Sequence, residues 1–123
     1  MKVLVDSSGW VHFFAGGPLA DRYAPHLTRP AKLITPTVVI YEVYKRLKRE
    51  LGEERALVAS GKMSATEVIP LTEPIAFLAA DLSLAHGLAM ADAIIYATAR
   101  YQDAQLITSD ADLKDLPGVL YLS

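Results

Sequence analysis

The chain contains no cysteine among its 123 residues. This absence excludes disulfide bonds, thiolate zinc sites and cysteine nucleophiles, and it fits the reducing cytoplasm. The three histidines, His12, His26 and His86, lack the i,i+3 or i,i+4 spacing that a zinc site would use. The glycine patterns of nucleotide-binding loops are missing as well. We therefore expect a cytoplasmic protein that uses neither zinc nor a glycine-rich phosphate loop.

Long apolar runs and a strong excess of one charge are also absent. No run approaches the roughly 20 residues needed to cross a bilayer, so we expect no membrane partner. The apolar run at the N-terminus is too short for a signal peptide. The formal net charge of −2 argues against nucleic-acid binding by bulk electrostatics alone. A metal ion or the local basic patch at residues 45–49 would have to supply the attraction.

What the sequence does contain is an alternation of strand and helix patterns. The length suits one domain over residues 1–123, and 52% hydrophobic residues allow one sizeable core. Strands are predicted at residues 2–5, 32–35, 67–70, 105–108 and 119–122, and helices between them at 9–15, 19–27, 36–51, 53–60, 75–86 and 91–100. This order favours an α/β layered domain with a mostly parallel central sheet. Thr35 and Pro36 are predicted as N-cap and first residue of the third helix, and Gly61 and Gly87 as helix stops.

Four carboxylates are predicted to meet at one edge of this sheet. Asp6 ends the first strand, and Asp110 follows the fourth. Glu42 lies in the second turn of one helix and Asp92 in the first turn of another, and both helices should start at the same edge. Ligands bind at the carboxyl edge of open parallel sheets, so all four acids can face one cleft. Asp112 would flank them.

Clustered carboxylates raise one another's pKa, and a hard divalent cation relieves this repulsion. Mg²⁺ and Mn²⁺ prefer oxygen ligands, and such a site can lower the pKa of a bound water and orient it toward a phosphodiester. Three of the four acids also have an ordinary explanation, and Asp6 is the exception. Asp92 could interact favourably with the positive end of its helix dipole, Asp110 could cap a short helix, and Glu42 could pair with Arg46 at i,i+4.

The residues that carry this pattern resemble those of PIN-domain ribonucleases, in particular VapC-like toxins of type II toxin–antitoxin systems. The resemblance rests on four segments across the chain, at residues 5–8, 35–42, 91–99 and 106–110. It implies a three-layer α/β/α sandwich around a central, mostly parallel sheet of about five strands. Leu113 departs mildly from the family pattern, which often has an aromatic residue there.

The resemblance also implies the chemistry. Asp6, Glu42, Asp92 and Asp110 become the catalytic and metal-binding quartet for Mg²⁺ or Mn²⁺, with Ser8, Thr108 and Asp112 as supporting residues. The implied partners are an RNA substrate, a cognate antitoxin and a second copy of the chain. Arg46 and Arg49 are minor candidates for RNA contacts.

Three alternatives remain open at this point. The fold could serve as a non-catalytic protein-interaction module, with Trp10, Phe13 and Phe14 as contacts. The nuclease could act on DNA. A phosphatase with an aspartyl-phosphate intermediate ranks low, because the residue two positions after Asp6 is Ser8 and not a second acid.

Overall fold

The computed structural model describes residues 1–123 as one five-stranded sheet covered by helices. All neighbouring strands are parallel, in the order β3-β2-β1-β4-β5. The strands are β1 (Val3–Val5), β2 (Leu33–Pro36), β3 (Glu67–Ile69), β4 (Gln105–Thr108) and β5 (Val119–Tyr121). The prediction of a mostly parallel sheet of about five strands is confirmed.

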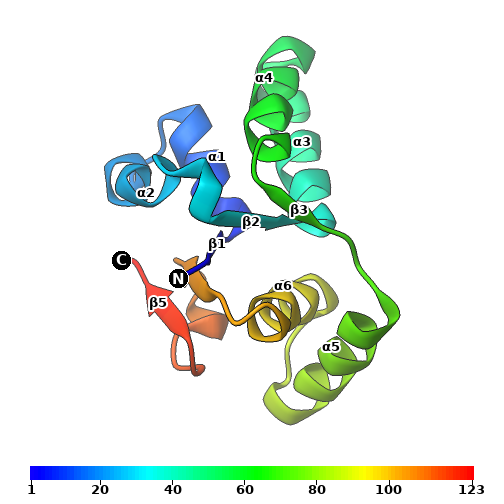
Figure 1. Ribbon diagram of the computed structural model, residues 1–123. Coiled ribbons are helices and arrows are strands. Elements are labelled where there is room, and N and C mark those ends of the chain that lie inside the picture. The colour runs from blue at the N-terminus through cyan, green and yellow to red at the C-terminus, as the bar shows by residue number, and fades with distance from the viewer.

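Six α-helices and two 3₁₀ turns connect the strands. They are α1 (Ser7–Ala15), α2 (Ala20–Leu27), η1 (Pro30–Lys32), α3 (Thr37–Leu51), α4 (Glu53–Ser64), α5 (Glu73–His86), α6 (Met90–Tyr101) and η2 (Ala111–Leu113). Helices α1 to α4 lie on one side of the sheet, and α5 and α6 lie on the other (Figure 1). This arrangement is the predicted three-layer α/β/α sandwich.

The central strand β1 and its neighbour β4 are buried on both faces, which explains their short uninterrupted apolar runs. Leu4 of β1 lies between Ile34 of β2 and Leu106 of β4, and all three side chains are buried. The chain leaves β1 toward β2 and β3 and returns to the other side of β1 only with β4. The strand order therefore reverses between β1 and β4. In open parallel sheets, a ligand crevice forms outside the carboxyl ends of two such strands.

The predicted N-cap at Thr35 and the predicted helix stop at Gly61 are wrong. Thr35 and Pro36 belong to β2 and do not begin the helix, and α3 starts at Thr37 without a side-chain cap. The hydroxyl of Thr35 is instead paired with that of Thr66 at 2.6 Å, inside the core. Helix α4 runs through Gly61 to Ser64, because Gly61 keeps a helical backbone. Tertiary packing against α3 thus outweighs the weak helix propensity of glycine.

The predicted stop at Gly87 is confirmed. Gly87 has a φ of 67°, the left-handed conformation that glycine adopts without a steric penalty, and its N–H donates to the carbonyl of Ser83. The chain then turns by 116° from α5 into α6. No single helix is long and apolar enough for a membrane span, and α5 and α6 reach that length and composition only as this bent pair.

Candidate active site

A pocket of about 520 Å³ opens at the carboxyl ends of β1 and β4, where the strand order reverses. Its walls come from the N-terminal parts of α1 and α6, one face of α3 and the loop after β4. The lining residues are Asp6, Ser7, Ser8, Val11, Tyr41, Glu42, Lys45, Arg46, Arg49, Asp92, Ser109 and Asp110. All four predicted acids are in this set, and they come from four different segments.

Asp6 lies at the bottom of the pocket and is only 4% exposed. Its position follows from local structure, because β1 ends at Val5 and Asp6 is the N-cap of α1. One carboxylate oxygen, Oδ1, accepts the backbone N–H of Ser7 at 2.7 Å. The other, Oδ2, accepts the hydroxyl of Thr108 at 2.7 Å. Both oxygens of Asp6 are therefore held in place by the fold.

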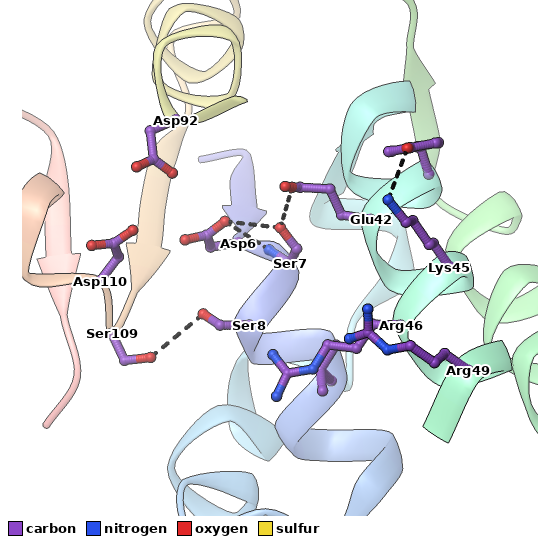
Figure 2. A pocket seen from close by; sticks show the side chains of 12 residues that line it. Asp6, Ser7, Ser8, Glu42, Lys45, Arg46, Arg49, Asp92, Ser109 and Asp110 are labelled. Atoms are coloured by element: carbon purple, nitrogen blue, oxygen red, sulfur yellow. Dashed lines mark hydrogen bonds between the residues drawn. The ribbon is translucent and has the colours of Figure 1, made fainter. Parts of the chain in front are cut away.

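Glu42 enters the pocket from α3. Its Oε1 accepts the hydroxyl of Ser7 at 2.6 Å, and the same hydroxyl lies 3.3 Å from Oδ1 of Asp6 (Figure 2). The alternative pairing with Arg46 is not observed, because the Nε of Arg46 lies 3.4 Å from Oε1 of Glu50. Glu42 thus faces the other acids and forms no ion pair.

Asp92, Asp110 and Asp112 form a second group on the opposite side of Asp6. Each offers one carboxylate oxygen, and these oxygens all lie within 4.8 Å of one another, close enough for one cation. Asp92 comes from the first turn of α6, and the other two come from the loop after β4. Figure 2 shows the carboxylates of Asp6, Asp92 and Asp110 turned toward a common space. Asp110 also caps η2 by accepting the N–H of Asp112 at 2.9 Å, as its ordinary explanation predicted.

The electrostatics of the cluster match those of a cation site. Burial, followed by the charges of Asp110 and Asp6, raises the pKa of Asp92 to about 7. Burial also raises the pKa of Asp6, against the hydrogen bonds from Thr108 and Ser7, which lower it. The acids therefore repel one another, and their oxygen atoms are ligands that Mg²⁺ and Mn²⁺ prefer. The residues fit a hard divalent cation.

The two predicted supporting hydroxyls differ in their contacts. Thr108 donates to Asp6 and also accepts the backbone N–H of Asp110 at 3.0 Å, so it links two acids. The hydroxyl of Ser8 has Ser109 as its neighbour, at 3.5 Å, and contacts no carboxylate. Ser109 in turn accepts the hydroxyl of the fully buried Tyr23 at 2.8 Å. Tyr23 on α2 thereby braces the loop that carries Asp110.

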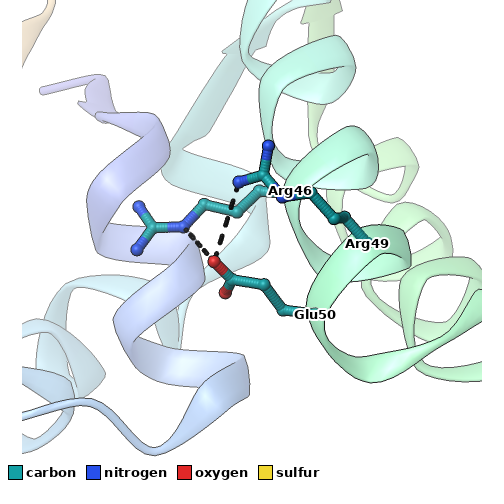
Figure 3. Close-up of polar contacts among 3 residues, drawn as sticks. All are labelled: Arg46, Arg49 and Glu50. Carbon is teal, nitrogen blue, oxygen red and sulfur yellow. Dashed lines mark hydrogen bonds and ion pairs between the residues drawn. The ribbon is translucent and has the colours of Figure 1, made fainter.

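A cationic wall faces these acids. It consists of Lys45, Arg46 and Arg49, which follow Glu42 on the pocket face of α3. Glu50 lies between the two guanidinium groups, 3.4 Å from Arg46 and 3.7 Å from Arg49 (Figure 3). None of the three cations forms an ion pair with an acid of the pocket. The pocket therefore has an acidic side and a basic side, and no ion pair joins them.

Ser7, Lys45 and Tyr23 are among the residues of this site that sequence reasoning missed. Ser7, which touches both Asp6 and Glu42, was passed over in favour of Ser8. Its signal was its position directly after Asp6, at the start of a helix. Lys45 stood in the basic patch but was not selected as a site residue. Tyr23 gave no signal, because its contact with Ser109 joins segments far apart in the chain.

The match to known families agrees with this geometry. The PIN domain family matches residues 3–119, and the chain belongs to that family. The predicted family resemblance is confirmed. The comparison with curated proteins gives no match.

Solved structures with the same fold include toxins of VapBC type. The chain is 27% identical to a protein in a toxin–antitoxin complex from Klebsiella pneumoniae, with a TM-score of 0.82 over 97% of this chain and 96% of that one. VapBC2 from Rickettsia felis, solved bound to a promoter DNA fragment, gives 20% identity and a TM-score of 0.76 over 99% and 98%. VapC20 from Mycobacterium tuberculosis, a toxin that cleaves the sarcin–ricin loop, gives 21% and 0.72 over 85% of both chains. The last two likenesses concern the fold alone.

Proposed function

We propose that this protein is a Mg²⁺- or Mn²⁺-dependent endoribonuclease and the toxin of a toxin–antitoxin pair. The observation that carries the proposal is the convergence of Asp6, Glu42, Asp92 and Asp110 on one pocket that also has a cationic wall. Membership of the PIN family and the structural likeness to the Klebsiella toxin–antitoxin complex support it.

A divalent cation bound by these acids supplies a water of lowered pKa and stabilises charge on the phosphate. The chain's own residues arrange the acids for that task. Thr108 holds one oxygen of Asp6, and the backbone of Ser7 holds the other. Asp92, whose pKa is about 7, would bind the cation as a carboxylate, so cation binding would release its proton.

The cationic wall binds the substrate backbone in this proposal. Arginine side chains recognise phosphate through paired N–H donors, and the wall lies across the pocket from the acids. We expect the double variant Arg46→Gln/Arg49→Gln to raise KM for RNA by about 3- to 10-fold with little change in kcat. The dependence of affinity on salt should also weaken, because each lost phosphate contact lowers the salt slope by about 1.

Steady-state cleavage of labelled RNA measures KM and kcat. Fluorescence anisotropy with labelled RNA in EDTA, at several salt concentrations, measures the salt slope of binding. Arg55→Gln on α4 is a control that removes one positive charge outside the pocket lining. An unchanged salt slope in the double variant would exclude phosphate contacts by these arginines.

The catalytic assignment is tested with Asp6→Asn and Asp92→Asn. Each should reduce RNA cleavage by more than about 100-fold, beyond the usual effect of residues that only support metal ligands. Cleavage of labelled RNA in Mg²⁺ and growth on induction of the gene measure the loss. Asp81→Asn, an exposed position on α5, is the matched control. Full activity in both site variants would contradict the catalytic assignment. Cleavage of DNA instead of RNA would contradict the proposed substrate and favour a DNA nuclease.

The proposal includes an antitoxin and a second copy of the chain, both acting in the cytoplasm. The antitoxin is supported by relatives solved as toxin–antitoxin and VapBC complexes. A homodimer is supported by exposed apolar side chains along α5 and its flanks, including Phe77, Leu84 and Met90. Light scattering of the purified chain measures its mass, and a monomer at all concentrations would contradict the dimer.

A further inference from the structure

Ser7 is the only hydrogen-bond donor to Glu42. Asp6, in contrast, is also held by Thr108 from the neighbouring strand. Glu42 comes from α3, which follows a different strand, and it carries a longer and more flexible side chain than an aspartate. The position of its carboxylate therefore depends on what it meets in the pocket.

The two donors of Ser7 serve two different acids. Its backbone N–H donates to Asp6 at 2.7 Å, and any residue at this position except proline could make that bond. Its hydroxyl has one proton and two acceptors within reach, Glu42 at 2.6 Å and Asp6 at 3.3 Å. The shorter and stronger bond is the one to Glu42. The side chain of Ser7 thus serves Glu42.

Without this hydroxyl, nothing in the structure would hold Glu42 next to Asp6. The two carboxylates carry the same charge, and Glu42 is one of the groups that raise the pKa of Asp6. Repulsion and side-chain entropy would both favour a rotamer turned toward solvent. Arg46 does not hold Glu42 in the pocket, because its guanidinium is paired with Glu50.

We propose that Ser7 is a positioning residue, which ties Glu42 to Asp6 so that both acids are presented together to the divalent cation. The inference rests on the proposed function, because it concerns the same acidic site. Ser8, its neighbour in sequence, points to Ser109 and does not share the role.

The test is titration of the purified protein with Mn²⁺ alone, without RNA, by isothermal calorimetry. Ser7→Ala should weaken Mn²⁺ binding by about 10-fold, the lower end of the range for residues that orient metal ligands. Ser7→Thr keeps the hydroxyl. Its Mn²⁺ affinity should stay within about 3-fold of the wild type, a smaller loss than that expected for Ser7→Ala. Ser60→Ala on α4 is the matched control, because its hydroxyl bonds only to the backbone of its own helix.

A double-mutant cycle with Glu42→Gln separates positioning from a general loss of structure. If Ser7 acts through Glu42, Ser7→Ala should cost little further affinity once Glu42 is neutral. An equal loss in both backgrounds would overturn the inference, as would wild-type affinity in Ser7→Ala or an equal loss in Ser7→Thr. Should Ser7→Ala fail to give a folded circular dichroism spectrum, Ser7→Gly repeats the same comparison.

The outcomes also separate this inference from the proposed function. A wild-type protein that binds no Mn²⁺ contradicts both. A wild-type protein that binds Mn²⁺ but leaves RNA intact contradicts the nuclease activity, and the comparison of Ser7→Ala with Ser7→Thr still decides the role of Ser7.

Discussion

The acidic pocket has two sides that are built differently. The anchored side consists of Asp6 and Glu42, whose carboxylates accept hydrogen bonds from Ser7 and Thr108. The open side consists of Asp92, Asp110 and Asp112. There, Asp110 accepts the backbone N–H of Asp112, and neither Ser7 nor Thr108 donates its hydroxyl to one of these acids. The two sides contain the same kind of ligand atom and differ in how firmly the fold holds it.

This difference indicates a division of roles. On the anchored side, neutral donors hold three carboxylate oxygens in place. The open side has its acids close together with little compensation, so that the pKa of Asp92 rises to about 7. The three oxygens that lie close enough for one cation belong to the open side, so cation binding there would change the protonation of Asp92 most.

Apart from the loss of an acid itself, the largest expected effect comes from removing the hydroxyl of Thr108 on the anchored side. Thr108→Val keeps the shape of the side chain but removes the donor to Asp6 and the acceptor for the N–H of Asp110. Leaving buried polar groups without partners should lower the free energy of unfolding by about 1–3 kcal/mol. Cleavage should fall about 10- to 100-fold, as for other residues that orient metal ligands.

Urea denaturation and steady-state cleavage measure these two quantities for Thr108→Val. Thr98→Val is the control, because its hydroxyl bonds only to the carbonyl of Ile94 within α6. Equal losses of activity in the two variants would show that the hydroxyl of Thr108 has no special role.

A smaller effect is expected on the open side, as a dependence of stability on pH. The folded pKa of Asp92, about 7, lies above the ordinary value of 3.8. Between these values the folded state binds a proton that the unfolded state has released. Without metal, the free energy of unfolding should therefore decrease as pH rises from about 4 to about 7. Asp6 should contribute in the same direction, because its pKa is also raised.

Thermal melts with EDTA across this pH range measure the dependence, and the same melts with Mg²⁺ should remove most of it. Asp92→Asn should flatten the curve without metal. A wild-type protein whose stability rises with pH over this range would contradict the assigned repulsion.

The fold was predictable because its signals are local. The apolar run before Asp6, the stop at Gly87 and the alternation of strands and helices each lie within a few neighbouring residues. Predictions failed where tertiary contacts outweighed local preference. Thr35 has the residue type of an N-cap, but pairing with Thr66 in the core draws it into β2.

The candidate site was predictable where local signals place its residues, and not where the direction of a side chain decides. The four acids could be placed from strand ends and helix starts. The choice between Ser7 and Ser8 could not, because it depends on the direction of two adjacent side chains in the first turn of α1.

The strand order has a consequence for the cell that makes this protein. β4 pairs directly with β1, and Asp110 follows β4, so the pocket needs both the first and the second-last strand of the sheet. A growing chain that has not yet reached β4 lacks the side of the pocket formed by Ser109 and Asp110, even when its N-terminal helices have formed. The acidic pocket is therefore complete only once the chain has been translated through β4 and the residues after it.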